Sequence, residues 1–119
     1  MSAVRHTSKR RTPRLDPMSQ LTATHSTGQP VVTLVDISLE GFAVHSLVAF
    51  EGGSRHQFSF TTAHGHTLQL VAVLVSSHRL ESSHGMLHVS GFRFDVTGPA
   101  MRQDIGMLID AVTSPLTFL

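Results

Sequence analysis

Five of the nine basic residues lie within the first 14 residues, where no acidic residue occurs. Arg10 and Arg14 stand four residues apart, with Arg11 between them. The planar guanidinium of arginine presents paired N–H donors that fit phosphate oxygens, or the O6 and N7 edge of guanine. In an extended arm the two groups can lie roughly 13 Å apart. This arm could therefore grip an anionic ligand at two points.

A second polar group follows in the segment Asp36-Ile37-Ser38-Leu39-Glu40-Gly41. The carboxylate of Asp36 can accept hydrogen bonds from the N1–H and N2–H₂ edge of guanine, and Ser38 can donate or accept. Gly41 permits a positive φ and a close approach of the backbone to a ligand. This turn therefore offers polar groups that can complement a guanine edge.

Each motif alone also has a simpler explanation. A basic arm is often only a solvated tail, although here it precedes a body that carries the remaining four arginines and all eight acidic residues. Asp36 and Ser38 are residue types that stabilise turns by bonding to their own backbone. The function is therefore argued from the two motifs together.

The elements that must position these residues are six short strands and one helix. Some of these segments alternate between apolar and polar residues, others are β-branched or apolar runs, and turn residues such as Gly, Pro and Ser separate them. The predicted strands are Gln20 to Ser26, Val31 to Val35, Phe42 to Val48, Arg55 to Thr62, Thr67 to Ser77 and Met86 to Asp95. Short consecutive strands of this kind favour an antiparallel meander or a small barrel.

Inner and outer faces can be assigned on the fifth strand, where Leu68, Leu70, Ala72 and Leu74 share one face. Gly91 in the last strand predicts a bulge or a close backbone approach. Phe42 follows Gly41 directly, and its apolar neighbours place it in the core.

The apolar period then changes to that of a helix, which follows the last strand. Apolar residues recur at helical spacing from Met101 to Val112. Thr97 or Gly98 can cap the helix, and Pro99 suits its first position. The helix should end before Pro115.

The order and spacing of the two motifs resemble the signature of the PilZ domain family of bacterial cyclic di-GMP receptors. In that family an Arg-x-x-x-Arg pair precedes Asp or Asn-x-Ser-x-x-Gly, and here RRTPR is followed by DISLEG with Asp36 22 residues after Arg14. The strand at Val71 to Val75, the segment VSGFRF and the final helix extend the resemblance over residues 9 to 113.

This resemblance implies a six-stranded antiparallel β-barrel with a C-terminal α-helix, which binds cyclic di-GMP on its outer face beneath the arm. It assigns phosphate and guanine contacts to Arg10 and Arg14, with help from Arg11. It assigns guanine contacts to Asp36 and Ser38, and room for the ligand to Gly41. His45 lies near the place where some members have a further basic contact.

We therefore expect a receptor without enzymatic activity, whose arm becomes ordered over the ligand and which then signals to an unidentified downstream protein. The domain organisation would be an arm at 1–17, the barrel and helix at 18–113 and a tail at 114–119. A divergent PilZ-like adaptor that binds no nucleotide is the alternative, and nucleic-acid binding by the arm is disfavoured because stacking aromatic residues are lacking.

Composition sets further expectations. The 119 residues suit one domain, and the absence of cysteine excludes disulfides and thiolate zinc sites. The nine histidines lack the accompanying ligands of a metal site, so we expect no metal and no cofactor. No apolar run approaches the roughly 20 residues that span a bilayer, and no secretory signal is apparent. A location in the bacterial cytoplasm is expected.

Overall fold

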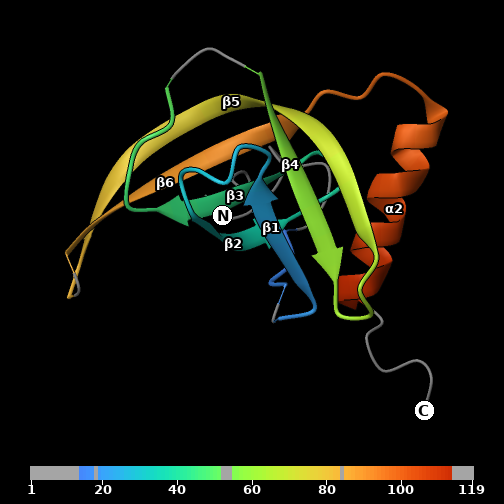
Figure 1. Cartoon of the computed structure of the whole chain (residues 1–119), viewed down its shortest axis with the longest axis horizontal. Coiled ribbons are helices and arrows are strands. Elements are labelled where there is room, and N and C mark those ends of the chain that lie inside the picture. The colour runs from blue at the N-terminus through green and yellow to red at the C-terminus, as the bar shows by residue number, and fades with distance from the viewer. Residues whose placement is uncertain (1–13, 18, 52–54, 84, 114–119) are drawn as a thin grey trace, which may run out of the picture.

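Six antiparallel strands curve into a nearly closed barrel, and one helix stands beside it (Figure 1). The computed structural model describes residues 14–17, 19–51, 55–83 and 85–113. The elements are β1 (Leu21–His25), β2 (Val32–Ile37), β3 (Gly41–Ser46), β4 (Arg55–Thr62), β5 (Thr67–Ser82), β6 (Gly85–Phe94) and α2 (Pro99–Thr113). The predicted fold class is confirmed.

The strands pair in the order β1-β4-β5-β6-β3-β2, so the sheet is not a simple meander. The two outer strands, β1 and β2, lie close together and bring the sheet nearly to closure. Because β6 pairs with β3, the end of β6 lies beside Gly41, the first residue of β3. This pairing of strands that are not consecutive in the sequence brings the C-terminal end of β6 next to the Asp36 to Gly41 segment.

Phenylalanine rings fill the barrel. Phe42 is fully buried, and its ring centroid lies 5.0 to 5.4 Å from those of four other phenylalanines. These partners are Phe58, Phe60, Phe92 and Phe94. Rings at such distances attract one another beyond the gain from burial alone. The expectation that Phe42 belongs to the core is confirmed.

Helix α2 begins at Pro99 and ends at Thr113, as its sequence signals predict. The N–H of Arg102 donates to the carbonyl of Gly98 at 3.2 Å, which places Gly98 at the start of the helix. Ile105 and Leu108 are buried, and the helix packs against β1 and β4. Among the described residues, no helix is both long and apolar enough to cross a membrane.

A β-bulge interrupts β2 just before the second motif. Leu34 pairs with Val44 and Asp36 pairs with Ala43, so Val35 is an extra residue. In a strand without a bulge, Leu34 and Ile37 would face opposite sides, because they lie three residues apart. With the bulge, both are buried in the core and Asp36 is turned toward the outer face. The predicted strand ended at Val35, but β2 continues through the bulge to Ile37.

A second bulge lies in β5 at Val75, between the pairs Leu74 with Phe92 and Ser76 with Gly91. A Cβ atom on Gly91 would lie 2.6 Å from the Ser76 hydroxyl, which confirms the expected close approach. Beyond this bulge the hairpin of β5 and β6 continues to Ser82, whereas the sequence predicted a strand end at Ser77. The prediction fell short because both faces of this extension are exposed, so apolar alternation gives no signal there.

Candidate ligand-binding site

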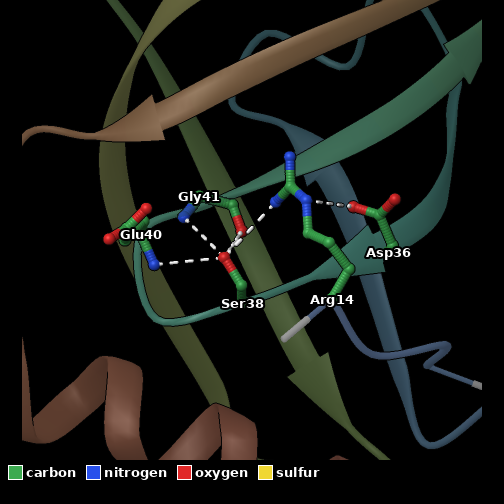
Figure 2. A network of polar contacts seen from close by, with 5 residues as sticks. All are labelled: Arg14, Asp36, Ser38, Glu40 and Gly41. Carbon is green, nitrogen blue, oxygen red and sulfur yellow. Dashed lines mark hydrogen bonds and ion pairs between the residues drawn. The ribbon is translucent and has the colours of Figure 1, made fainter. Parts of the chain in front are cut away.

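The turn between β2 and β3 is closed by Ser38. Its hydroxyl oxygen accepts hydrogen bonds from the N–H groups of Glu40 at 3.2 Å and Gly41 at 3.3 Å (Figure 2). The Ser38 N–H donates to the Gly41 carbonyl at 2.8 Å. The Glu40 carbonyl accepts from Phe94 N–H at 3.0 Å, so the turn is also attached to the end of β6. The turn is therefore a fixed part of the barrel wall.

Gly41 is needed for strand packing. A Cβ atom at this position would lie 2.0 Å from the carbonyl oxygen of Phe92, far inside contact distance. Gly41 does not adopt the positive φ that glycine permits; among the described residues, the glycines with positive φ are Gly28, Gly65 and Gly85. The close approach that glycine permits here is to the backbone of β6.

Arg14 lies across the outside of this turn, between Asp36 and Ser38 (Figure 2). Its Nη1 donates to the Ser38 hydroxyl at 3.3 Å, and its Nε lies 3.5 Å from Asp36 Oδ1. The next residue, Leu15, exchanges two backbone hydrogen bonds with Ile37, at 2.8 and 3.0 Å. Arg14, the last residue of the first motif, thus contacts the second motif directly.

The carboxylate of Asp36 is incompletely hydrogen-bonded. Its Oδ1 is buried and accepts no hydrogen bond from the described residues, and the 3.5 Å separation from Arg14 exceeds the 2.7–2.9 Å of a charge-assisted bond. A buried acceptor without a donor is unfavourable by about 1–3 kcal/mol. The carboxylate therefore has unused capacity to accept a hydrogen bond.

A cavity of about 680 Å³, open to solvent, adjoins the turn. Its polar wall contains Arg14, Ser38, Glu40 and Gly41, and Arg93 and Arg102 contribute from β6 and α2. Apolar residues complete the lining: Leu39, Val75, Phe92, Phe94 and Val96. This site, called the arginine pocket below, combines an apolar surface with three guanidinium groups and one carboxylate. Such a lining fits a ligand that has flat apolar faces and negative charge.

The sequence matches the PilZ domain family over residues 8–111. The chain belongs to the PilZ domain family. No curated protein sequence gives a match.

Solved PilZ proteins share the fold. The PilZ domain of YcgR from Escherichia coli, solved with c-di-GMP, superposes with a TM-score of 0.67 at 18% identity, covering 87% of this chain and 91% of that domain. The Bacillus subtilis inhibitor of motility, MotI/DgrA, gives a TM-score of 0.62 at 15% identity, covering 91% of this chain and 52% of the other. The chain spans 48% of the longer YcgR structure in complex with c-di-GMP, so it corresponds to about half of these proteins.

The structure brings together four of the six site residues expected from the PilZ signature. Arg14, Ser38 and Gly41 line the arginine pocket, whereas Asp36 lies behind Arg14 and is not in the lining. Arg10 and Arg11 lie outside the described residues. His45 is not at this site; it lines a separate groove with Val31, Leu47 and Leu87.

Arg93 and Arg102 of the arginine pocket were not anticipated from the sequence. Both side chains are exposed, and each lies in a segment assigned only to the fold, a strand and a helix. Isolated exposed arginines carry no pattern that distinguishes ligand contacts from solvated charge. The only available signal was that Arg93 lies within the segment VSGFRF, which resembles a PilZ strand motif.

Proposed function

We propose that this PilZ domain is a receptor for cyclic di-GMP, which binds in the arginine pocket. The observation that carries the proposal is the docking of Arg14 onto Asp36 and Ser38 at the rim of the cavity. It is supported by two solved relatives of the same fold, the PilZ domain and the longer structure of YcgR, which were obtained with c-di-GMP.

The chemistry of the pocket suits this ligand. Cyclic di-GMP contains two guanines and two phosphodiesters, so it offers flat faces, donor edges and two negative charges. The lining of three arginines and one glutamate has a net charge of +2. The cavity volume of about 680 Å³ falls within the usual range for ligand sites of about 300–1,000 Å³.

Arg14 would provide the first contact. Its guanidinium has five N–H donors, and its contacts with the described residues engage only Nε and Nη1. The remaining donors are available for a phosphate oxygen or for guanine O6 and N7. Without ligand, Arg14 forms an ion pair with Asp36. When Arg14 turns to the ligand, the Asp36 carboxylate can itself accept from a guanine edge.

The arm would complete the site. Arg10 and Arg11 precede Arg14 by four and three residues, within reach of the same ligand. Neutralisation of their charge by the phosphodiesters would hold the arm against the barrel, and the combined surface of arm, ligand and turn would be read by a downstream protein. The chain would act by binding, in the cytoplasm of a bacterium, without catalysis.

Isothermal titration tests the proposal. The full chain should bind cyclic di-GMP saturably, and more tightly than cyclic di-AMP, because guanine O6 and N2–H₂ match the guanidinium and carboxylate groups. GMP serves as a control with the same base and a single phosphate, and it should bind far more weakly. The absence of heat at high micromolar cyclic di-GMP would overturn the receptor proposal and favour an adaptor that binds no nucleotide.

A further inference from the structure

Two arginines of the arginine pocket belong to neither signature motif. Arg93 lies on β6, where it pairs with Gly41 on one side and Val73 on the other. Arg102 lies in the first turn of α2. Both line the pocket. Neither guanidinium forms an ion pair or a hydrogen bond within the part of the chain that the structure describes. By contrast, Arg14 and Arg55 are paired with Asp36 and Asp95.

Arg102 stands where the helix disfavours a cation. The amino end of a helix carries partial positive charge, so acidic residues stabilise it and basic residues weaken it. The first turn of α2 contains no acidic residue. A bound anion beside this turn would interact favourably with both the Arg102 guanidinium and the amino end of the helix. It would therefore offset the unfavourable interaction between them.

The neighbours of Arg93 leave its guanidinium uncovered. Gly41 has no side chain, and the next strand contributes Val73 and, through the bulge, Val75, which is 54% exposed. The bulge thus presents an apolar surface in the same pocket as the Arg93 cation. A base could rest on this surface while its phosphate meets the guanidinium.

We propose that Arg93 and Arg102 form a second phosphodiester subsite of the arginine pocket, on the side of β6 and α2. This inference rests on the proposed function. Arg14 takes one phosphodiester, and the pair from β6 and α2 takes another. The second phosphodiester belongs either to the same cyclic dinucleotide or to a second molecule stacked on it. In both cases the ligand bridges Arg102 of α2 and Arg14.

Titration of the full chain with cyclic di-GMP tests the subsite. Arg93→Gln and Arg102→Gln should each weaken binding about tenfold, the scale of one lost charge-assisted contact, and the double variant should weaken it more. Arg93→Lys should retain part of the affinity, since it keeps the charge and loses the fork. Arg79→Gln is the matched control, because it removes the same charge from the exposed β5–β6 hairpin, outside the pocket lining; its affinity should stay within about twofold of the wild type.

Thermal melts of the ligand-free variants add a second readout. Arg102→Gln should melt no lower than the wild type, because it removes a cation from the amino end of α2. The combination of unchanged or raised stability with weaker binding separates a ligand contact from a structural role.

Stoichiometry distinguishes the source of the phosphodiester. Two bound ligands falling to one in the double variant would assign the subsite to a second molecule, and weaker binding at unchanged stoichiometry would assign it to the same molecule. Equal affinity and stoichiometry in the wild type and the double variant would overturn the subsite while leaving the receptor proposal intact. A wild-type chain that binds no cyclic di-GMP would instead overturn the proposed function.

Discussion

At the scale of single residues, Ser38 fits both explanations given for it from the sequence, stabilisation of the turn and a contribution to the ligand site. It is buried and saturated with hydrogen bonds, accepting from two N–H groups of its own turn and from Arg14. A serine that stabilises a turn is therefore also a residue that positions Arg14, the arginine proposed to bind the ligand. Under the proposed function, turn formation and ligand binding would depend on the same oxygen atom.

Ser38→Ala should lower both stability and affinity. The loss of the hydroxyl removes contacts worth about 0.5–1.5 kcal/mol each, so the free energy of unfolding should fall by about 1–2 kcal/mol in urea titrations. Affinity for cyclic di-GMP should fall about tenfold, because Arg14 loses one of its two partners.

Ser46 provides the matched control. It is equally buried, and its hydroxyl donates to the Val48 carbonyl at 2.8 Å, but it lines the separate groove. Ser46→Ala should lower stability by a similar amount and leave affinity unchanged. If both variants bound as tightly as the wild type, Ser38 would have only a structural role.

Asp36 should act through its hold on Arg14 and through a guanine edge. Asp36→Ala should weaken binding of cyclic di-GMP by about 1–3 kcal/mol, the scale of a good base contact. Asp36→Asn should recover part of this loss, because its amide oxygen can still accept. Calorimetry with both cyclic di-GMP and cyclic di-AMP checks this: equal losses for the two ligands would mean that Asp36 makes no contact with guanine.

At the scale of elements, two bulges shape the site. The extra residue Val35 turns Asp36 outward, and the extra residue Val75 is itself exposed in the arginine pocket. Bulges often occur beside functional sites because they redirect side chains. The β-branched run at Val31 to Val35 and the apolar faces of Thr67 to Ser77 predicted the strands on which the two bulges lie. These patterns could not predict the bulges, since an inserted residue changes the period only once and the pairing partner is not known from the sequence.

Alanine substitutions at Gly41 and Gly106 should change the stability of the fold in opposite directions. Gly41→Ala should destabilise the fold by about 1–3 kcal/mol or more, because its Cβ would collide with the Phe92 carbonyl and force β3 away from β6. Gly106→Ala in α2 should stabilise it by about 1 kcal/mol, since nothing lies within 4 Å of the added atom. Urea denaturation measures both; a neutral Gly41→Ala would contradict the packing role.

At the scale of the whole molecule, the sequence predicted the fold more completely than the site. The order of six strands and one helix follows from local patterns, and so does the core position of Phe42. The arginine pocket depends on the crossover that pairs β6 with β3 and on the position of α2. Arg93 and Arg102 join Arg14 only through this tertiary arrangement, so local sequence could not reveal them.

A histidine pair should make the stability of the fold depend on pH. His25 Nε2 lies 3.0 Å from His56 Nδ1, and the His25 ring packs against Phe50 and Phe58. Burial, and then the charge of His56, lowers the pKa of His25 from its ordinary value of 6.5. The folded state therefore binds fewer protons than the unfolded chain. The contribution of neutral His25 to the stability of the fold is present above pH 6.5 and is lost as the pH falls below it.

Urea midpoints measured from pH 7.5 to 5.5 check this prediction. The wild type should lose stability toward the acidic end, and His25→Gln should show a smaller loss. His64→Gln is the control, since His64 is exposed in the turn after β4. If His25→Gln followed the wild-type curve, the pair would not be the origin of the pH dependence.

The central claim, that cyclic di-GMP occupies the arginine pocket, is tested most directly by following backbone amide resonances of the full chain during a titration with the ligand. We predict saturable shifts at Ser38 to Gly41, at Arg93 and at Arg102, and little change at Leu47 and Val48 in the separate groove. Shifts centred on that groove, or no saturable shifts at all, would contradict the account.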